Sequence, residues 1–165
     1  ARSIVSSYPI PDFYHKFPEV NETSRRHLIR NRELQQLSKS VTSTIEDDYG
    51  HGLQHAEKVT RDAGALIIIE GRRRGYSRES IRRHLFLVQC AGLLHDIKRK
   101  QPDHAIAGAE FAAKVLAAFS LNATEIRDVC SAIRNHEAFK KIIAIDSVAG
   151  ELISDCLYDA DKFRI

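Results

Sequence analysis

One stretch of the sequence, residues 85–94, is apolar on almost every side and ends directly in His95 and Asp96. A helix that is apolar all round belongs in the centre of a helical protein. An imidazole and a carboxylate buried at its end cost free energy unless something compensates them. A metal ion would compensate both, because imidazole nitrogen and carboxylate oxygen are ligands for Mn, Fe, Co, Ni and Zn. The pair alone leaves most of the coordination sphere unfilled, so the rest of the chain is expected to supply further ligands.

The other apolar residues recur with the spacing of helices, and no segment shows the sustained two-residue alternation of a strand. The chain of 165 residues is long enough for one domain with a real core. The sequence therefore predicts an all-α fold, a single bundle of about six helices. These helices are expected over about 23–47, 53–74 and 77–94, and from about 102, 122 and 146 onward. The inward stripe of the fourth is expected to consist of Ile106, Ala109, Ala113 and Leu116.

The start of the chain has a different character from the rest. Pro9, Pro11 and Pro18 interrupt it among scattered aromatic residues, which predicts an irregular arm over residues 1–22 and a helical domain over 23–165. The aromatic residues of the arm would pack either on the core or on a second copy of the chain in a homodimer. The sequence stops inside the last predicted helix, and we expect the domain to continue past Ile165.

The basic residues form three short runs, at 72–74, 82–83 and 98–100. Such runs are most often solvated faces or charges at helix C-termini, and only the third is well placed to contact a phosphate. The formal net charge is +3. Because the runs are short and lack interleaved aromatic residues, a nucleic-acid partner is not expected.

The cysteines and the hydropathy pattern bear on location. Cys90, Cys130 and Cys156 lie in apolar patterns and form no CxxC pair, which predicts reduced core residues in a cytoplasmic protein. No segment is long and apolar enough to suggest a membrane span.

Metal-competent side chains recur on the inward faces of several predicted helices. His55, His104 and His136 each occupy an otherwise apolar stripe, and Asp159 and Asp161 come near the end of the last helix. A single inward histidine is more often a hydrogen-bonded core residue than a ligand, but helical bundles build metal sites by this kind of convergence. Among the other histidines, His51 is expected in a turn or beside a ligand, His84 is expected to be structural, and His15 and His27 are expected at the surface.

Three short sequence segments that contain candidate ligands resemble motifs of the HD superfamily of metal-dependent phosphohydrolases. The segment "HAEKV" carries His55, "AGLLHDI" carries His95 and Asp96, and "DADKF" carries Asp161. The resemblance implies an HD-domain helical bundle with a central metal site held by these four residues. Asp161 matches the family pattern of Ala-Asp followed by a basic residue, and Asp159 is the second choice.

Two further segments resemble branches of that superfamily that hold two metal ions. They are "HAIAGAEFA", which begins with His104, and "IRNHE", which contains His136. The resemblance implies that Asp96 bridges the two ions and that both histidines bind the second. Many members read His-Asp-Ile-Gly-Lys, whereas Lys98 and Arg99 stand at the last two of these positions here. This departure leaves the basic residue of the site open among Lys98, Arg99 and Lys100.

The resemblance implies hydrolysis of a phosphate ester, either a monoester or a diester, of a nucleotide or related small molecule. One or two divalent ions (Mn, Fe, Co, Ni or Zn, less readily Mg) would lower the pKa of a bound water towards neutrality. Asp96 would orient the nucleophile, while Lys98 and Arg99 would contact phosphate oxygens. Three alternatives are a di-iron oxygenase of the HD type, a non-catalytic regulatory module that binds metal or nucleotide, and a structural protein whose histidines are satisfied in the core.

Overall fold

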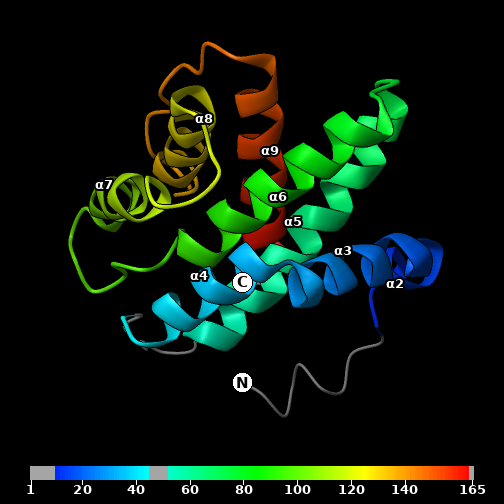
Figure 1. Cartoon of the computed structure of the whole chain (residues 1–165), viewed down its shortest axis with the longest axis horizontal. Helices are drawn as coiled ribbons and strands as arrows, with labels where there is room; N and C mark the ends of the chain where they lie inside the picture. The colour runs from blue at the N-terminus through cyan, green and yellow to red at the C-terminus, as the bar shows by residue number, and fades with distance from the viewer. Residues whose placement is uncertain (1–9, 45–51, 164–165) are drawn as a thin grey trace.

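The computed structural model describes residues 10–44 and 52–163. Within these ranges it contains helices and no strand, which confirms the predicted all-α fold (Figure 1). The helices in chain order are α2 (Asp12–Lys16), α3 (Pro18–Arg30), α4 (Arg32–Thr42), α5 (Leu53–Arg73), α6 (Arg78–Leu94), α7 (His104–Leu116), α8 (Ala123–Arg134) and α9 (Val148–Lys162).

The centre of the molecule is an antiparallel pair formed by α5 and α6. Gly75 adopts a φ of 72°, and the N–H of Tyr76 donates to the carbonyl of Gly71 at 2.9 Å, which closes α5 in a Schellman motif. Ser77 then caps α6 by accepting from the N–H of Ser80 at 3.1 Å. All residues from 85 to 94 of α6 are buried, as the apolar run predicts.

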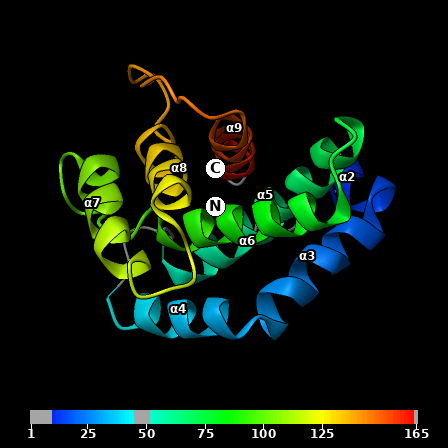
Figure 2. The same cartoon turned by 45° about the horizontal axis from the view of Figure 1, so that its top comes forward.

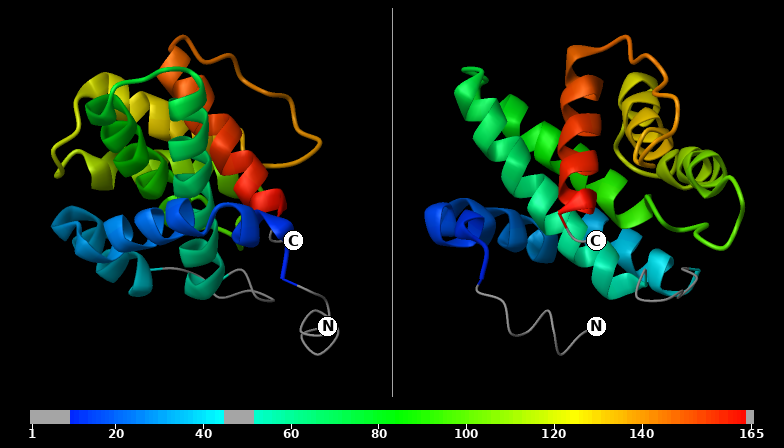
Figure 3. Two further views of the ribbon diagram at one scale, coloured as in Figure 1. Left: turned by 90° about the vertical axis from the view of Figure 1, so that its right-hand side faces the viewer. Right: turned by 180° about the vertical axis from the view of Figure 1, so that it is seen from behind.

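The remaining helices enclose this pair from two sides. In Figure 2, α3 and α4 lie on one side of it, and α7, α8 and α9 lie on the other. The main packing partners are α3 on α5, α4 on α6, α9 on α5 and α8, and α7 on α8. Figure 3 shows the end of α9 next to α2, where the ring centroids of Phe13 and Phe163 are 6.1 Å apart.

The beginning of the chain departs from the prediction of an irregular arm over residues 1–22. Between residues 12 and 22 that prediction is wrong, because all of these residues except Phe17 lie in α2 or α3, while residues 1–9 lie outside the described part of the chain. Pro11 precedes α2, and Pro18 is the first residue of α3. Proline has its φ fixed near the helical value and needs no N–H partner in the first turn, so here it begins helices.

The helix predicted over 23–47 is divided in two. Asn31 ends α3 and caps α4, accepting from the N–H of Leu34 at 3.1 Å with its side-chain oxygen. The first half begins earlier than predicted, at Pro18, and the second ends at Thr42. Asparagine competes for backbone partners within a helix and is favoured at N-caps, which explains the break.

The inward stripe of α7 also differs from the prediction. Ile106 is 44% exposed, while the face that packs against the core consists of Ala105, Gly108, Ala109, Ala112 and Leu116. Small side chains let α7 approach α8 closely, and the Cys130 thiol lies 3.3 Å from the carbonyl of Ala109. Close backbone packing, not the burial of the largest side chain, sets the rotation of this helix.

Two other features of the described residues concern chemistry and hydropathy. Cys90 and Cys156 are buried, Cys130 is half-buried, and all three are free thiols. In the part of the chain that the structure describes, no helix combines the length and the apolar character needed to cross a membrane.

The contact between α5 and α6 generates a test of stability. A Cβ atom on Gly92 would lie 2.8 Å from the backbone Cα of Thr60, whereas one on Gly108 would lie 3.4 Å from its nearest neighbour, the carbonyl oxygen of His95. We expect Gly92→Ala to lower the free energy of unfolding by about 1–3 kcal/mol, because the two helices must move apart. Gly108→Ala should leave it unchanged or raise it by up to about 1 kcal/mol through helix propensity. Urea unfolding measures the free energy of unfolding of both variants. Equal values for Gly92→Ala and Gly108→Ala would contradict the close approach of α5 and α6 at Gly92.

Candidate metal centre

The predicted ligands come together at the ends of five helices. His55 lies in the first turn of α5, His95 directly follows α6, and His104 is the first residue of α7. His136 follows the end of α8, and Asp161 lies in the last turn of α9. All five are buried, and so is Asp96. The five ligands meet because α5 and α7 begin, and α6, α8 and α9 end, in the same region of the core.

The first group of candidate ligands consists of His55, His95 and Asp161. The Nε2 atom of His55 lies 3.0 Å from Oδ1 of Asp161, and Nε2 of His95 lies 3.6 Å from the same oxygen. The other oxygen of Asp161, Oδ2, accepts a hydrogen bond from the Lys162 ammonium at 2.7 Å. One carboxylate oxygen is therefore held by Lys162 while the other faces the two imidazoles.

The second group consists of Asp96, His104 and His136. Oδ1 of Asp96 lies 3.6 Å from Nε2 of His104 and 3.4 Å from Nε2 of His136. The two imidazole nitrogens are 3.3 Å apart. Three potential ligand atoms thus face one another within a buried space.

Asp96 connects the two groups through its two oxygens. While Oδ1 faces His104 and His136, Oδ2 lies 3.6 Å from Nε2 of His95 in the first group. A carboxylate shared in this way can serve two sites at once. The arrangement is the one that the resemblance to two-metal branches implies.

Backbone carbonyl groups orient two of the imidazoles. Nδ1 of His95 lies 2.8 Å from the carbonyl oxygen of Gly92, and Nδ1 of His136 lies 2.6 Å from that of Ile133. A carbonyl only accepts, so in each ring Nδ1 carries a proton and Nε2 is the atom presented to the centre. A hydrogen bond of this kind behind a ligating histidine is usual in metal sites.

The electrostatics keep the carboxylates ionised. Burial by itself raises the pKa of Asp161, but the neighbouring His55, His95 and Lys162 outweigh it and hold that pKa well below the usual value. Burial likewise raises the pKa of Asp96, and His136, His95 and Arg99 outweigh it in the same direction. Both side chains are therefore charged at neutral pH, the form in which they bind metal.

The surroundings of one buried nitrogen atom indicate that a metal ion fits this site. Nε2 of His95 is buried and has no hydrogen-bond partner among the described residues, since the nearest carboxylate oxygens are 3.6 Å away. A buried polar atom without a partner carries a large desolvation penalty. A cation between His95 and the carboxylates would remove this penalty, and the mixed nitrogen and oxygen donor set suits a divalent transition metal.

Comparison with known proteins identifies the family. The HD domain family model matches residues 52–163, a range that contains all six candidate ligands. The chain belongs to the HD domain family. This membership confirms the resemblance found in the sequence.

A solved structure supports the same assignment. The fold is similar to the crystal structure of a predicted HD superfamily hydrolase from an uncultured Thermotogales bacterium, with a TM-score of 0.56 and 25% sequence identity. The similarity covers 78% of this chain and 70% of the Thermotogales chain. A search of curated protein sequences found no match.

The basic residues after the His-Asp pair of this HD domain point in different directions. Successive tight turns fold the chain back, so that Nη1 of Arg99 lies 3.0 Å from Nε2 of His104 and 3.6 Å from Oδ1 of Asp96. The ammonium of Lys98 instead lies 4.8 Å from the ring centroid of Phe111, and Lys100 is exposed. Arg99 is therefore the basic side chain nearest to the candidate ligands, and the functional roles of Lys98 and Arg99 stay predictions.

Other sequence predictions have mixed outcomes. Asp159 is exposed and lies in neither ligand group, and neither does His84. The prediction that His27 is a surface residue is wrong, because it is half-buried and bonds to Gln89. His51 lies outside the described residues.

Two neighbours of the centre were not singled out from the sequence. Lys162 holds Asp161, and Oε1 of Glu137 lies 3.6 Å from Nδ1 of His104. Each directly follows a candidate ligand in the quoted motifs "DADKF" and "IRNHE". Adjacency to a ligand was the available signal for both.

The two aspartates of α9 allow a direct test of the first ligand group. We expect Asp161→Ala to lose at least one equivalent of bound divalent ion, because it removes the oxygen that faces both His55 and His95. Asp159→Ala is the matched control on the same helix and should bind as much metal as the parent protein. Metal content after dialysis, with the rise in Tm on adding metal, measures the difference. Unchanged metal content in Asp161→Ala would contradict the assignment.

Proposed function

We propose that this HD-domain protein is a metal-dependent phosphohydrolase that cleaves a phosphate ester of a nucleotide or related small molecule. The observation that carries the proposal is the position of Asp96, whose two oxygens face different groups of buried histidines. The chain belongs to the HD domain family, and its fold is similar to that of the predicted HD superfamily hydrolase from a Thermotogales bacterium. Both findings support hydrolysis as the reaction class.

The chain offers residues for two ions. His55, His95 and Asp161 would hold one ion, His104 and His136 the other, and Asp96 would contribute an oxygen to each. When bound, such ions supply Lewis-acid activation of water and neutralise charge on the phosphoryl group. The burial of all six side chains limits access of bulk water and strengthens electrostatic interactions within the site.

The surrounding residues position the ligands and the substrate. Lys162 fixes one oxygen of Asp161, and the carbonyl groups of Gly92 and Ile133 fix the rings of His95 and His136. The Arg99 guanidinium lies at the edge of the second group, half-exposed, where it can donate charge-assisted hydrogen bonds to phosphate oxygens. A cation at this place favours a substrate that carries phosphate.

Asp96 provides the main test of the reaction. Asp96→Ala should reduce kcat/KM for divalent-metal-dependent hydrolysis by on the order of a hundredfold to a thousandfold or more, because both ligand groups lose a shared anion. The assay uses a generic phosphodiester, a generic phosphomonoester and a nucleotide panel, with Asp159→Ala as control and circular dichroism to verify folding. Undiminished hydrolysis would refute the mechanism. Oxygen uptake by iron-loaded protein without phosphate release would favour the oxygenase instead.

The neighbouring cations allow a second test. Arg99→Ala should raise KM or lower kcat about 10- to 100-fold for phosphate substrates, the loss expected for one charge-assisted hydrogen bond. Lys98→Ala should change either constant less than threefold, since its ammonium packs on Phe111. Steady-state kinetics of the two variants on one substrate compare them directly. A larger effect of Lys98→Ala would assign the phosphate contact to Lys98.

A further inference from the structure

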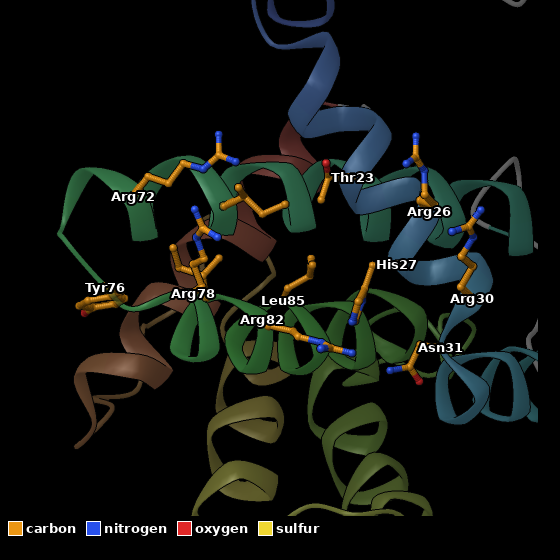
Figure 4. Close-up of a pocket in the computed structure, with 12 residues that line it drawn as sticks. Thr23, Arg26, His27, Arg30, Asn31, Arg72, Tyr76, Arg78, Arg82 and Leu85 are labelled. Carbon is orange, nitrogen blue, oxygen red and sulfur yellow. The ribbon is translucent and has the colours of Figure 1, made fainter.

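A second concave site lies away from the metal centre, between α3, α5 and α6 (Figure 4). Its volume is about 870 Å³. Along α5, Ile68 in this groove is thirteen residues beyond His55, a separation of about 20 Å at the rise of a helix. The lining residues are Thr23, Arg26, His27, Arg30, Asn31, Ile68, Arg72, Tyr76, Arg78, Ile81, Arg82 and Leu85.

Arginine dominates the lining of this space, here called the arginine groove. Among the described residues, its lining contains Arg26, Arg30, Arg72, Arg78 and Arg82 and no acidic side chain. Arg26 forms an ion pair with Glu22 at 3.2 Å. For the other four, the described part of the chain places no carboxylate within ion-pair distance, and all four are exposed.

The charge in the groove exceeds that of the whole molecule. Its five arginines carry five positive charges, while the chain has a formal net charge of +3, so the remainder of the protein is net negative. Guanidinium groups brought together from three helices repel one another unless an anion neutralises them. Because the planar guanidinium matches two phosphate oxygens at once, arginine is the side chain suited to a phosphate ligand.

The arginines lie at both ends of an apolar floor. Figure 4 shows Arg72 and Arg78 towards the end marked by Tyr76, and Arg82 directed towards the end that contains His27. Leu85 lies between these ends in Figure 4, and Ile68 and Ile81 also belong to the apolar part of the lining. An apolar surface with an aromatic ring, flanked by charged donors, suits an organic group that carries phosphates better than inorganic phosphate alone.

Buried and partly buried hydrogen bonds hold one wall of the groove in place. Nδ1 of His27 lies 2.7 Å from Oε1 of Gln89, whose Nε2 donates to the carbonyl of Ser24 at 2.9 Å. The Ser24 hydroxyl in turn donates to the carbonyl of Arg61 at 2.7 Å. Because Oε1 of Gln89 accepts, Nδ1 of His27 carries the proton, and Nε2 is the ring nitrogen left for a ligand. These bonds join α3, α5 and α6, so the groove is formed before a ligand arrives.

We propose that the arginine groove binds a nucleoside polyphosphate at a site separate from the metal centre. The phosphates contact the exposed guanidinium groups, and the base lies on the apolar floor beside Tyr76. The volume is within the range of small-molecule sites. A nucleic-acid strand is disfavoured, because among the described residues Tyr76 is the one Phe, Tyr or Trp side chain in the lining, and proteins that bind such strands use a series of stacking aromatic residues.

The test measures binding to metal-free protein, so that failure of the hydrolysis proposal has no effect on it. Titration calorimetry with ATP in the presence of EDTA compares the parent protein with the double variant Arg30→Ala/Arg82→Ala. We expect the double variant to bind at least about tenfold more weakly, as the loss of two charge-assisted contacts implies. The matched control Arg127→Ala/Arg134→Ala removes the same charge from exposed positions on α8 and should bind within about twofold of the parent.

Further probes separate the phosphate and nucleoside contributions. Tripolyphosphate should bind more weakly than ATP, and Tyr76→Ala should remove that difference without changing the affinity for tripolyphosphate. Adenosine should not compete with ATP.

Several outcomes would overturn the proposal. The proposal is wrong if ATP does not bind to the metal-free protein, if the two double variants lose the same affinity for ATP, or if adenosine binds as tightly as ATP. Binding of a single-stranded RNA that depends on Arg30 and Arg82, with no binding of tripolyphosphate or ATP, would assign the groove to nucleic acid.

Discussion

A buried carboxylate between two sets of imidazoles is the interaction around which the molecule is arranged. Asp96 faces His95 with one oxygen and His104 and His136 with the other, and all four side chains are buried. Burial of such a charge is costly unless partners surround it on every side. The helix ends that converge on Asp96 bring imidazole groups next to it, and these groups stabilise its ionised form. The same arrangement of side chains suits a metal ion.

The α5–α6 pair supplies the rigid base for this centre. Thr60 and Gly92 let the two helices touch at the backbone, and the glycine-ended turn at Gly75 aligns them. As a consequence, His55 at the start of α5 and His95 at the end of α6 lie at the same end of the pair, with ring centroids 5.4 Å apart. The arginine groove uses the other half of the same two helices, so one scaffold carries two sites of different chemistry.

The two sites use positive charge differently. Near the metal centre, Arg99 is close to ligands and to a carboxylate, so its charge is already partly compensated. In the arginine groove, Arg30, Arg72, Arg78 and Arg82 have no such compensation within the described residues. Uncompensated arginines retain their full capacity to bind an external anion.

The sequence by itself determined the helical class, the family and the six candidate ligands, because helix periodicity and local motifs are short-range properties. Pro11 and Pro18 predict an irregular segment but instead stand at the starts of α2 and α3, since the same fixed φ can break a helix or begin one. Only the tertiary structure decided that Arg99 rather than Lys98 lies beside Asp96, and that Ile106 faces outward. It alone revealed the arginine groove. The runs at 72–74 and 82–83 by themselves are typical of solvated faces or of charges at helix C-termini, and residues of three helices line one groove only once those helices are packed.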